Sequence, residues 1–510
     1  MKKRMSWLLA LLLCLVCLAG CQSGKTSEEP EASKIQDLAE SKIGLITGTM
    51  TALMTPEILP EAEYLEYNNA ADVAMSLMMG KIDAYPADES LYLSLLWEGQ
   101  AVDRIDERLA SSDYGMIFGK GENLQLQAEL NEFLAQFRAE GGLEEYETKW
   151  FSDSEPTEFL SYENLNGENG TLTVGICSST KPFVYMKNGS YVGFDIDLLI
   201  LFAEKYGYDL DFEDTQFGSI LTGVVMGSYD MGVSGFTITE ERAQSVDFSD
   251  VYHTEDLVMV IQSGAAAEGS FWASIVESFE KTFIREDRWK LITEGIGTTI
   301  LISLCAVLGG TAVGFLLYLA ARAHNQRVAR LVKLLVKVYS KVIAGTPTLV
   351  ILMLLFYVVF GKTDIDGVIV AIIGFTLIFA SFVYEQLTLT VDGVDKGQTE
   401  AARALGYSRN QTFFRIILPQ AMKMFVPVYS AEIVGLIKST SVVGFIAVND
   451  LTKMGDIIRS STYEAFFPLI AVAVIYFMIT WVAIMLLNIL KRKTEPKRRK
   501  ERNILKGVVR

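Results

Sequence analysis

Histidine is nearly absent from this sequence of 510 residues, which contains only His253 and His324. Structural zinc sites and Ser–His–Asp triads usually draw on histidine, and two isolated copies supply neither convincingly. Cysteine is also scarce, and three of the five cysteines lie within the first 21 residues. The other two, Cys177 and Cys305, lie in different regions of the chain. The sequence therefore predicts no metal site and no structural disulfide.

Positive charge is lacking from the first part of the chain. Residues 21–290 hold 17 Lys and Arg against 49 Asp and Glu, a net charge of −32. Residues 291–510 reverse this balance, with 25 against 13 and a net charge of +12. An acidic part followed by a basic, apolar part argues against nucleic acid as a partner. It favours a membrane protein whose basic segments lie inside the cell.

The N-terminus predicts an export signal. Lys2, Lys3 and Arg4 precede an apolar run, which ends in Leu18-Ala19-Gly20-Cys21. This ending resembles the lipobox of bacterial lipoproteins, so residues 1–20 would be removed and Cys21 would carry the lipid. A plain signal peptide and an uncleaved anchor are the alternatives. Residues 21–40 follow as a polar tether that is too poor in apolar residues to pack.

The next part of the chain alternates between predicted strands and helices. Strands are expected at Ile43–Ile46 and Leu172–Ile176, and a helix at Asp195–Lys205. Two such runs, 41–151 and 171–262, are separated by an acidic linker at 152–170. Alternation of this kind predicts parallel sheets, with ligands bound at the carboxyl ends of the strands.

Several motifs in these two runs resemble the lobes of polar amino-acid binding proteins. The first lobe of that family is matched by Val192-Gly193-Phe194-Asp195, by the stretch from Gly235 to Arg242 and by Val246-Asp247-Phe248-Ser249-Asp250. The second lobe is matched earlier in the chain, by Lys42-Ile43-Gly44, Gly48-Thr49 and Gly80–Ala84, and then Asp88. This reversed order resembles a circular permutation. It implies that the tether and the first membrane span both leave from the hinge.

A free amino acid carries a carboxylate and an ammonium, so a selective site needs a cation and an anion on facing walls. Arg242 offers a planar fork that binds a carboxylate bidentately. The resemblance implies that Asp88 takes the ammonium, with its neighbour Glu89 as the rival. It also implies further ligand-binding residues, which are Thr237, the Gly235 carbonyl, Thr49, the backbone of Met50, and Phe183.

The sequence departs from the family at two of these places. Met50 stands where a second threonine is common, and Thr180 stands where an aromatic side chain often covers the ligand. Both departures concern the identity of the amino acid rather than the class of ligand. Asp83 and Asp195 are interpreted as structural residues.

The last part of the chain predicts a five-span membrane domain. Trp272–Lys290 is expected to lie as an amphipathic helix at the outer interface. Residues 291–492 follow as the membrane domain and 493–510 as a basic tail. With the binding domain outside, the tail and the loop Arg322–Lys341 would fall inside the cell. The predicted spans are each near the roughly 20 residues that cross a bilayer, and they run over Gly295–Ala320, Ile343–Phe360, Val368–Leu389, Phe425–Val448 and Phe466–Leu490.

A helical hairpin is predicted between the third and fourth spans. Helix formers from Glu400 to Leu405 end at Gly406, and Ser408 with Gln411 has capping-box spacing for a second helix that runs to Pro419. These residues are similar to the EAA loop of ABC importer permeases. The resemblance implies that the hairpin docks on a separate ATPase subunit through Glu400, Ala401, Ala402, Gly406 and Pro419.

No ATPase site of the chain's own is predicted. Gly361-Lys362-Thr363 looks like the end of a phosphate loop, but Phe356 stands where a glycine is required. The chain is therefore expected to be a transport subunit rather than an enzyme, with ATP bound by the partner. Glu432 and Lys438, which are costly inside an apolar span, are candidates for the transport pathway.

These observations favour a two-lobed α/β binding domain followed by an all-α permease of an ABC importer for a polar amino acid. The resemblance implies a homodimer of the permease in a bacterial membrane. A ligand-gated channel and a chemosensory receptor with an amino-acid-binding ectodomain are the alternatives. A channel would need a pore loop and a filter, and a receptor would need a signalling domain after Leu490.

Overall fold

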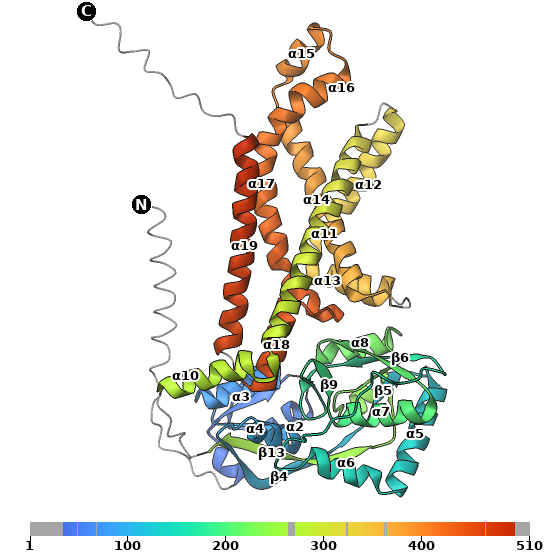
Figure 1. Ribbon diagram of the computed structural model, residues 1–510, viewed down its shortest axis with the longest axis vertical. Coiled ribbons are helices and arrows are strands. Elements are labelled where there is room, and N and C mark those ends of the chain that lie inside the picture. The colour runs from blue at the N-terminus through green and yellow to red at the C-terminus, as the bar shows by residue number, and fades with distance from the viewer. Residues whose placement is uncertain are drawn as a thin grey trace, which may run out of the picture.

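The computed structural model describes residues 34–47, 49–67, 69–263, 271–322, 325–361, 363, 365–464 and 466–494. A two-lobed α/β part lies at one end, and long helices rise from it (Figure 1). This arrangement confirms the predicted fold class. The predicted signal peptide, Cys21, most of the tether and nearly all of the basic tail lie outside the described residues.

The second lobe is built on a five-stranded sheet in the order β2-β1-β3-β13-β4. β1 pairs in parallel with β2 and β3, whereas β13 runs antiparallel to β3 and β4. The strands are β1 (Lys42–Ile46), β2 (Glu63–Tyr67), β3 (Ala84–Asp88), β4 (Val102–Tyr114) and β13 (His253–Gln262), and the helices are α2 (Met50–Ile58), α3 (Ala70–Met78) and α4 (Glu89–Trp97).

The first lobe has its own five-stranded sheet, in the order β10-β6-β11-β5-β12. A small sheet of β7 (Ser179–Thr180), β8 (Val184–Lys187) and β9 (Ser190–Val192) lies beside it. The main strands are β5 (Ile117–Gly119), β6 (Thr171–Ile176), β10 (Asp209–Asp214), β11 (Met231–Gly232) and β12 (Val246–Phe248). The helices are α5 (Leu124–Ala139), α6 (Gly142–Trp150), α7 (Phe194–Tyr206), α8 (Phe217–Val225) and the short α9 (Glu240–Ala243).

Apolar burial holds the first lobe together across distant parts of the sequence. Trp150, from the end of α6, is fully buried in the same core as Phe194 and Phe202 of α7. Its indole N–H donates to Oδ2 of Asp197 at 2.9 Å, which satisfies the polar atom of the ring. Burying each of these side chains contributes about 1.5–3 kcal/mol. These contacts fix α6 to α7, which follows it by more than forty residues in the sequence.

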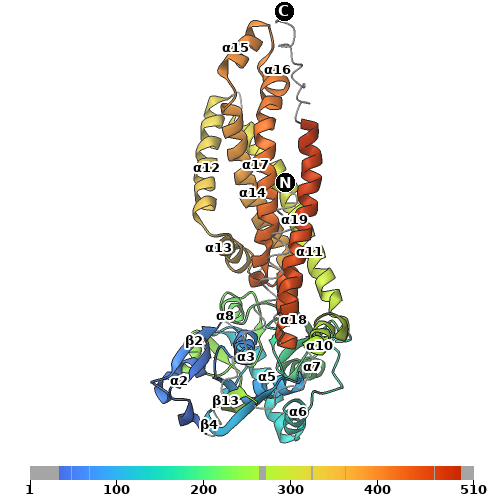
Figure 2. The same cartoon turned by 90° about the vertical axis from the view of Figure 1, so that its left-hand side faces the viewer.

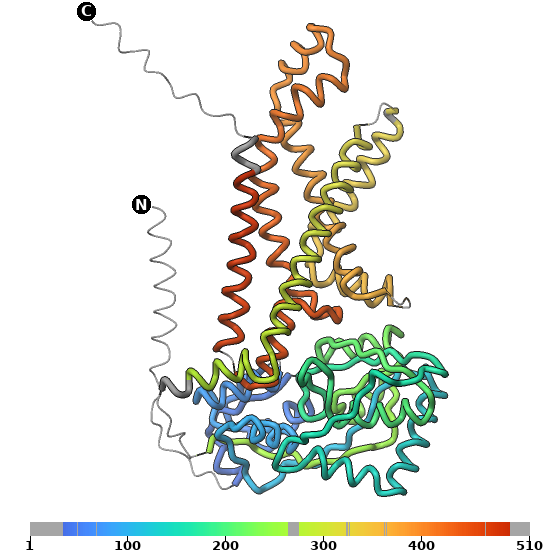
Figure 3. The backbone as a smooth tube through the Cα atoms, viewed as in Figure 1, coloured from blue at the N-terminus to red at the C-terminus, as the bar shows by residue number. Residues whose placement is uncertain are grey.

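Two crossovers join the lobes, one from β4 to β5 and one from β12 to β13. The Tyr252 N–H donates to the Tyr114 carbonyl at 3.1 Å, and the Ser249 N–H donates to the Met116 carbonyl at 2.8 Å. The crossovers are therefore hydrogen-bonded side by side and form the hinge. Figure 3 traces the described chain through both lobes and through the helices.

β13 corrects two expectations from the sequence. The stretch 171–262 was assigned to the first lobe, but β13 belongs to the sheet of the second lobe. The membrane span was also expected to leave from the hinge. β13 touches the hinge only at His253, which pairs with Tyr114, and it ends at Gln262, which pairs with Val102 at the other end of the sheet. A strand of ten residues is roughly 33 Å long, so β13 ends about that far from the hinge.

The tether also does not start from the hinge. The first described residues lie on β4, where the Ile35 N–H donates to Oε2 of Glu107 at 3.1 Å. Glu107 is seven residues before Tyr114 at the hinge end of the same strand. The first described residues and the end of β13 therefore both lie on the second lobe.

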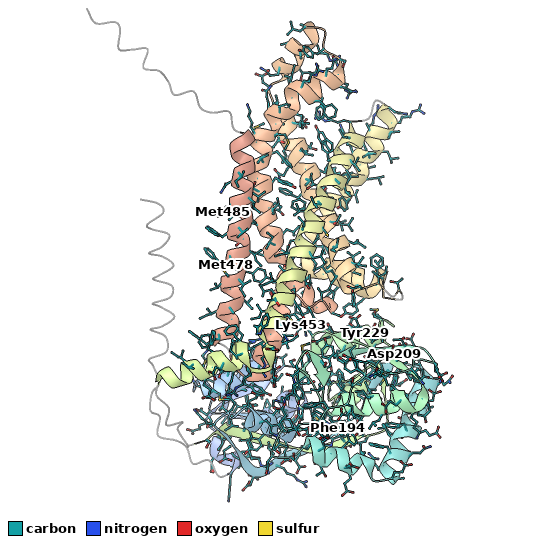
Figure 4. The ribbon with its side chains drawn as sticks, in the orientation of Figure 1. Phe194, Asp209, Tyr229, Lys453, Met478 and Met485 are labelled. Atoms are coloured by element: carbon teal, nitrogen blue, oxygen red, sulfur yellow. The ribbon has the colours of Figure 1, made fainter. Side chains whose placement is uncertain are left out.

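Among the described residues, four helices are long and apolar enough to span a bilayer, or five if one bent pair is counted as a span. Figure 2 shows them standing side by side above the two lobes. Met478 and Met485 lie on an outer face, and both are about half exposed (Figure 4). The helices are α11 (Trp289–Ala321), α12 (Gln326–Gly345), α13 (Thr348–Met353), α14 (Gly367–Asp392), α17 (Leu418–Ser439) and α19 (Phe466–Thr494).

The second predicted span is wrong in its details. The segment Arg322–Lys341 was expected to be a loop, but α12 is helical from Gln326 to Gly345. It meets the helix that begins at Thr348 at an angle of 113°. Pro347 lies at this corner, where its missing N–H cannot continue the helix. The sequence did not predict this helix because the basic residues of α12 favoured a cytoplasmic loop.

The predicted interfacial helix is shorter than expected. α10 (Phe271–Phe279) is followed by a π-helical turn, Glu280–Ile284. The chain then breaks at Glu286, where φ is 56°, before α11 begins. Phe279 packs against Phe467 of α19, with ring centroids 5.7 Å apart. α10 is thereby held across the base of the bundle (Figure 1).

A helix that the sequence analysis did not predict, α18 (Leu451–Thr462), connects the membrane domain to the first lobe. Lys453 of α18 donates from Nζ to Oδ1 of Asp214 at 3.0 Å and to the Thr215 carbonyl at 3.2 Å. Both charged side chains of this ion pair are buried. Burial alone would lower the pKa of Lys453, but Asp214 outweighs it and the pKa is raised. Figure 4 shows Lys453 where the bundle meets the soluble part.

The other end of α18 contacts the second lobe. Arg459 forms an ion pair with Asp72 of α3. Just after the helix, the hydroxyls of Tyr463 and Ser94 share a hydrogen bond of 2.6 Å. One helix of the membrane domain is therefore bonded to both lobes.

Candidate functional site

Arg242, the predicted carboxylate binder, lies on α9 in the first lobe. The hydroxyl of Thr239 caps this short helix by accepting from the Arg242 N–H at 3.2 Å. The guanidinium lies over the rings of Phe217 and Phe236, 5.7 and 5.8 Å from their centroids. Its Nη1 donates to the carbonyl of Thr237 at 2.9 Å. The aromatic rings and the carbonyl hold the fork in one position, so little side-chain entropy would be lost on binding an anion.

Asp88, the predicted ammonium binder, lies at the carboxyl end of β3 in the second lobe. Burial raises the pKa of its carboxyl group, while the Tyr114 hydroxyl and the Arg242 guanidinium act in the opposite direction. Burial in turn lowers the pKa of Arg242, and Asp88 opposes that shift. The two groups come from opposite lobes and act electrostatically on each other. The predicted cation and anion therefore lie on different lobes, near enough for each to shift the pKa of the other.

Glu255 is a second buried acid beside Asp88 that the sequence analysis missed. It lies on β13, and Ser90 donates to its two carboxylate oxygens, from N–H at 2.8 Å and from Oγ at 2.9 Å. Burial raises the pKa of Glu255 to about 8, and the charge of Asp88 adds to the shift. Tyr114 of β4 interacts with both acids. The sequence signal for Glu255 is an acidic residue two positions before the apolar core of a predicted strand.

Gly235 and Phe183 meet at the base of the cleft. Gly235 has a φ of +64°, and a Cβ atom there would lie 2.6 Å from the ring of Phe183. Phe183 stacks on Tyr114 with centroids 5.2 Å apart. The Gly235 N–H donates to Oδ2 of Asp195 at 2.9 Å. Only glycine allows the aromatic ring to approach the backbone so closely.

Asp195 fixes the turn that contains Gly235. Its Oδ1 accepts from the Tyr252 hydroxyl at 2.7 Å. Burial raises the pKa of Asp195 to about 7. These two bonds join α7 to the turn after β11 and to the hinge. Asp195 therefore holds these three elements together.

Thr49 and Met50 lie at the carboxyl end of β1, next to β3 in the same sheet. The hydroxyl of Thr49 donates to the Ile46 carbonyl at 2.7 Å and accepts from the Ala52 N–H at 3.3 Å as the cap of α2. Met50 is 39% exposed. Both residues share the sheet edge with Asp88, and their contact with a ligand stays a prediction.

The predicted hairpin lies at the far end of the bundle from the two lobes (Figure 2). α15 (Lys396–Ala404) ends with Gly406 at a φ of +84°, and α16 (Arg409–Thr412) begins with the predicted capping box of Ser408 and Gln411. These features confirm the local structure expected from the sequence. The second helix does not end at Pro419, however, because Pro419 lies at the start of α17, where its missing N–H costs no hydrogen bond.

The exposed face of the hairpin has an unusual composition. Glu400 and Ala401 are exposed, whereas Ala402 is buried against the rest of the hairpin. Leu405 is 78% exposed at the tip. Whether this tip contacts another protein stays a prediction.

The two pathway candidates lie on α17. Glu432 is half-buried and Lys438 is exposed in the single chain. Their part in transport stays a prediction.

The fold and the site define a class of protein, a two-lobed solute-binding domain joined to a helical membrane domain. The family model of bacterial extracellular solute-binding proteins, family 3, matches residues 172–417. This match begins in β6 of the first lobe and extends past β13 into the membrane helices. A probable amino-acid ABC transporter permease of Bacillus subtilis, YckA, is 34% identical over 203 residues, which are 40% of this chain and 88% of that protein. The chain belongs to the family of amino-acid ABC transporter permeases, and it carries a solute-binding domain.

Two further proteins share part of this sequence. The histidine/lysine/arginine/ornithine transport system permease HisQ of Escherichia coli is 28% identical over 215 residues and is covered to 92%. A crystal structure of an amino acid ABC transporter with histidines is 28% identical, with a TM-score of 0.38. That comparison covers 44% of this chain and 99% of the other.

Proposed function

We propose that this chain captures a free polar amino acid outside the cell and passes it to its own membrane domain for import. The observation that carries the proposal is that Arg242 and Asp88 come from opposite lobes and act electrostatically on each other. An α-amino acid presents a carboxylate and an ammonium at a fixed short separation. Such a ligand would bind Arg242 through two hydrogen bonds and Asp88 through a charge-assisted one. Because the groups lie on different lobes, the ligand stabilises the closed form.

Delivery of the ligand would depend on α18. Lys453 binds the first lobe and Arg459 binds the second, and both lie on the same helix. A helix of 12 residues is about 18 Å long and does not stretch. Opening the lobes would therefore break one of these ion pairs or move α18 relative to α11 and α19, which it packs against. This arrangement would report the state of the cleft to the membrane domain.

The energy for transport would come from a separate ATPase subunit that binds the hairpin of α15 and α16. Two copies of the membrane domain would form the conduit, so the assembly would carry two binding domains. The binding domain would lie outside and the hairpin inside, since the basic residues of α12 and of the hairpin lie at the end remote from the lobes. Lipid at Cys21 would add a second attachment to the membrane.

Calorimetric titration tests the proposed binding. The full chain in lipid nanodiscs is titrated with each of the twenty common amino acids, and at least one polar amino acid is expected to bind. Arg242→Ala is expected to weaken binding by roughly 30-fold to 5,000-fold, since removing one partner of a buried charged contact costs about 2–5 kcal/mol. Arg108→Ala serves as the matched control because Arg108 is 70% exposed and lies on β4 away from the cleft. Failure of all twenty amino acids to bind would refute the capture step, and full affinity of Arg242→Ala would refute the residue assignment.

Transport is tested in proteoliposomes that contain the chain and its ATPase subunit. Uptake of the bound amino acid should require ATP and the hairpin. Ion conductance by the chain without an ATPase would instead indicate a channel.

A further inference from the structure

A cavity of about 700 Å³ lies at the hairpin end of the bundle, opposite the binding domain. Its walls come from the ends of α11 and α14 and from both helices of the hairpin. This volume lies within the range of small-molecule sites in proteins, about 300–1,000 Å³. The hairpin that lines this cavity lies at the end of the bundle away from the two lobes (Figure 2).

Four cations line this cavity, which are Arg322, Lys396, Arg403 and Arg409, against one carboxylate, Asp392. Arg322 is already paired, because its Nη2 donates to Oδ1 of Asp392 at 2.8 Å. Its guanidinium also lies 4.9 Å from the centroid of the Tyr318 ring. Within the described parts of the chain, the other three cations make no ion pair. A net charge of +3 therefore faces the cavity without a counter-charge.

The rest of the wall is largely apolar. Phe413 and Phe414 contribute aromatic rings, and Leu319, Val391 and Ile417 contribute aliphatic side chains. α11 ends at Ala321 and α14 at Asp392, so the cavity lies where two membrane-spanning helices stop. At that depth a bilayer presents its headgroups and the first carbons of its acyl chains.

We propose that this cavity binds an anionic phospholipid of the inner leaflet, with its phosphate between Lys396, Arg403 and Arg409. A free phosphate ion would satisfy the cations but would leave the apolar wall facing water, so the amphipathic lining favours the lipid. The bound headgroup would join the hairpin to the ends of α11 and α14. Anionic lipid would therefore stiffen the connection through which the hairpin acts on the spans.

Native mass spectrometry of the full chain in detergent tests the proposal. The chain is titrated with phosphatidylglycerol, with phosphatidylcholine of the same acyl chains, and with inorganic phosphate. We expect phosphatidylglycerol to bind at least tenfold more tightly than phosphatidylcholine. A triple variant, Lys396→Gln with Arg403→Gln and Arg409→Gln, should reduce the affinity for phosphatidylglycerol at least tenfold. Arg322 stays unchanged because its loss would leave Asp392 without its partner.

The matched control removes the same number of charges from the same end of the bundle. Arg327→Gln, Arg330→Gln and Lys333→Gln change exposed residues of α12 that do not line the cavity. This variant should keep the affinity of the unchanged chain. Equal losses in both triple variants would show a general surface attraction and would overturn the proposal. Tight binding of phosphate that excludes the lipid, or lipid binding unchanged by the cavity variant, would also overturn it.

Discussion

Lys181 of the first lobe and Glu98 of the second form a buried ion pair, in which Nζ donates to Oε1 at 2.8 Å. The side chain of Lys181 is only 4% exposed. Its ammonium also lies 3.1 Å from a carboxylate oxygen of Glu155 in the linker and 5.4 Å from the centroid of the Trp97 ring. This contact joins the two lobes away from the predicted ligand-binding residues, so it stabilises their relative position in this structure.

Glu98→Gln should weaken amino-acid binding through the closing equilibrium. The charged hydrogen bond is worth about 1.5–3 kcal/mol, so loss of part of it should raise Kd by roughly tenfold. Lys181 keeps Glu155 as a partner, and the fold should persist. Calorimetry on the full chain measures the effect. Glu140→Gln, at an exposed position with no recorded partner, is the control. Unchanged affinity of Glu98→Gln would show that the pair does not contribute to closure.

The stability of the binding domain should depend on pH through Glu255. Its folded-state pKa is about 8 against an ordinary value of 4.5. The folded protein therefore keeps a proton that the unfolded chain releases as the pH rises above about 4.5. The free energy of unfolding should fall from about pH 5 to pH 8, by at most about 1.4 kcal/mol for each pH unit.

Glu255→Gln removes this titration and leaves Asp88 and Asp195 in place. Between pH 5 and pH 8, the midpoint temperature of thermal unfolding should fall more steeply for the unchanged chain than for Glu255→Gln. The two curves should differ little in slope below pH 4. Parallel curves over the whole range would contradict the raised pKa.

Lys453→Met should separate the first lobe from α18. The substitution leaves Asp214 charged, buried and without its cation, which costs about 3–5 kcal/mol. The double variant Lys453→Met with Asp214→Asn should recover much of this loss, because no unpaired charge remains. Thermal unfolding measures the two costs, and protease sensitivity at the junction reports undocking. A double variant as unstable as the single one would show that packing, rather than charge, matters here.

Leu405→Asp should leave the chain folded and able to bind its amino acid. Leu405 is 78% exposed, so the substitution removes little contact within the chain. Uptake driven by the ATPase subunit should fall at least tenfold, since a charge would be placed in the proposed docking surface. Leu124→Asp changes a leucine that is 59% exposed in the soluble part and should leave uptake intact. Normal uptake by Leu405→Asp would place the docking surface elsewhere.

Local signals account for most of what could be predicted from the sequence. The hairpin turn follows from Gly406, which tolerates a positive φ, and the start of its second helix follows from the capping box of Ser408 and Gln411. The apolar runs of α11, α14 and α19 have the length of a span. α12 was missed because its charged residues share the helix with apolar ones.

The residues around the candidate site also fall into those that local motifs predict and those that they do not. Arg242 and Asp88 could be found because each lies in a motif that is contiguous in the sequence. Glu255 and Lys181 could not, since Glu255 lies 165 residues from its partner Ser90 and Lys181 lies 83 residues from Glu98. No local pattern records a contact across that separation.

The sequence by itself determined two properties of this protein, the charged motifs of its solute-binding domain and an apolar membrane domain, because hydrophobic periodicity and short motifs are properties of neighbouring residues. The tertiary structure alone decided how they are joined. Only in three dimensions do β1 and β13 share a sheet, so that the membrane connection leaves from the second lobe instead of the hinge. Only there does α18 reach Asp214 and Asp72 together, because packing selects contacts by distance in space rather than along the chain.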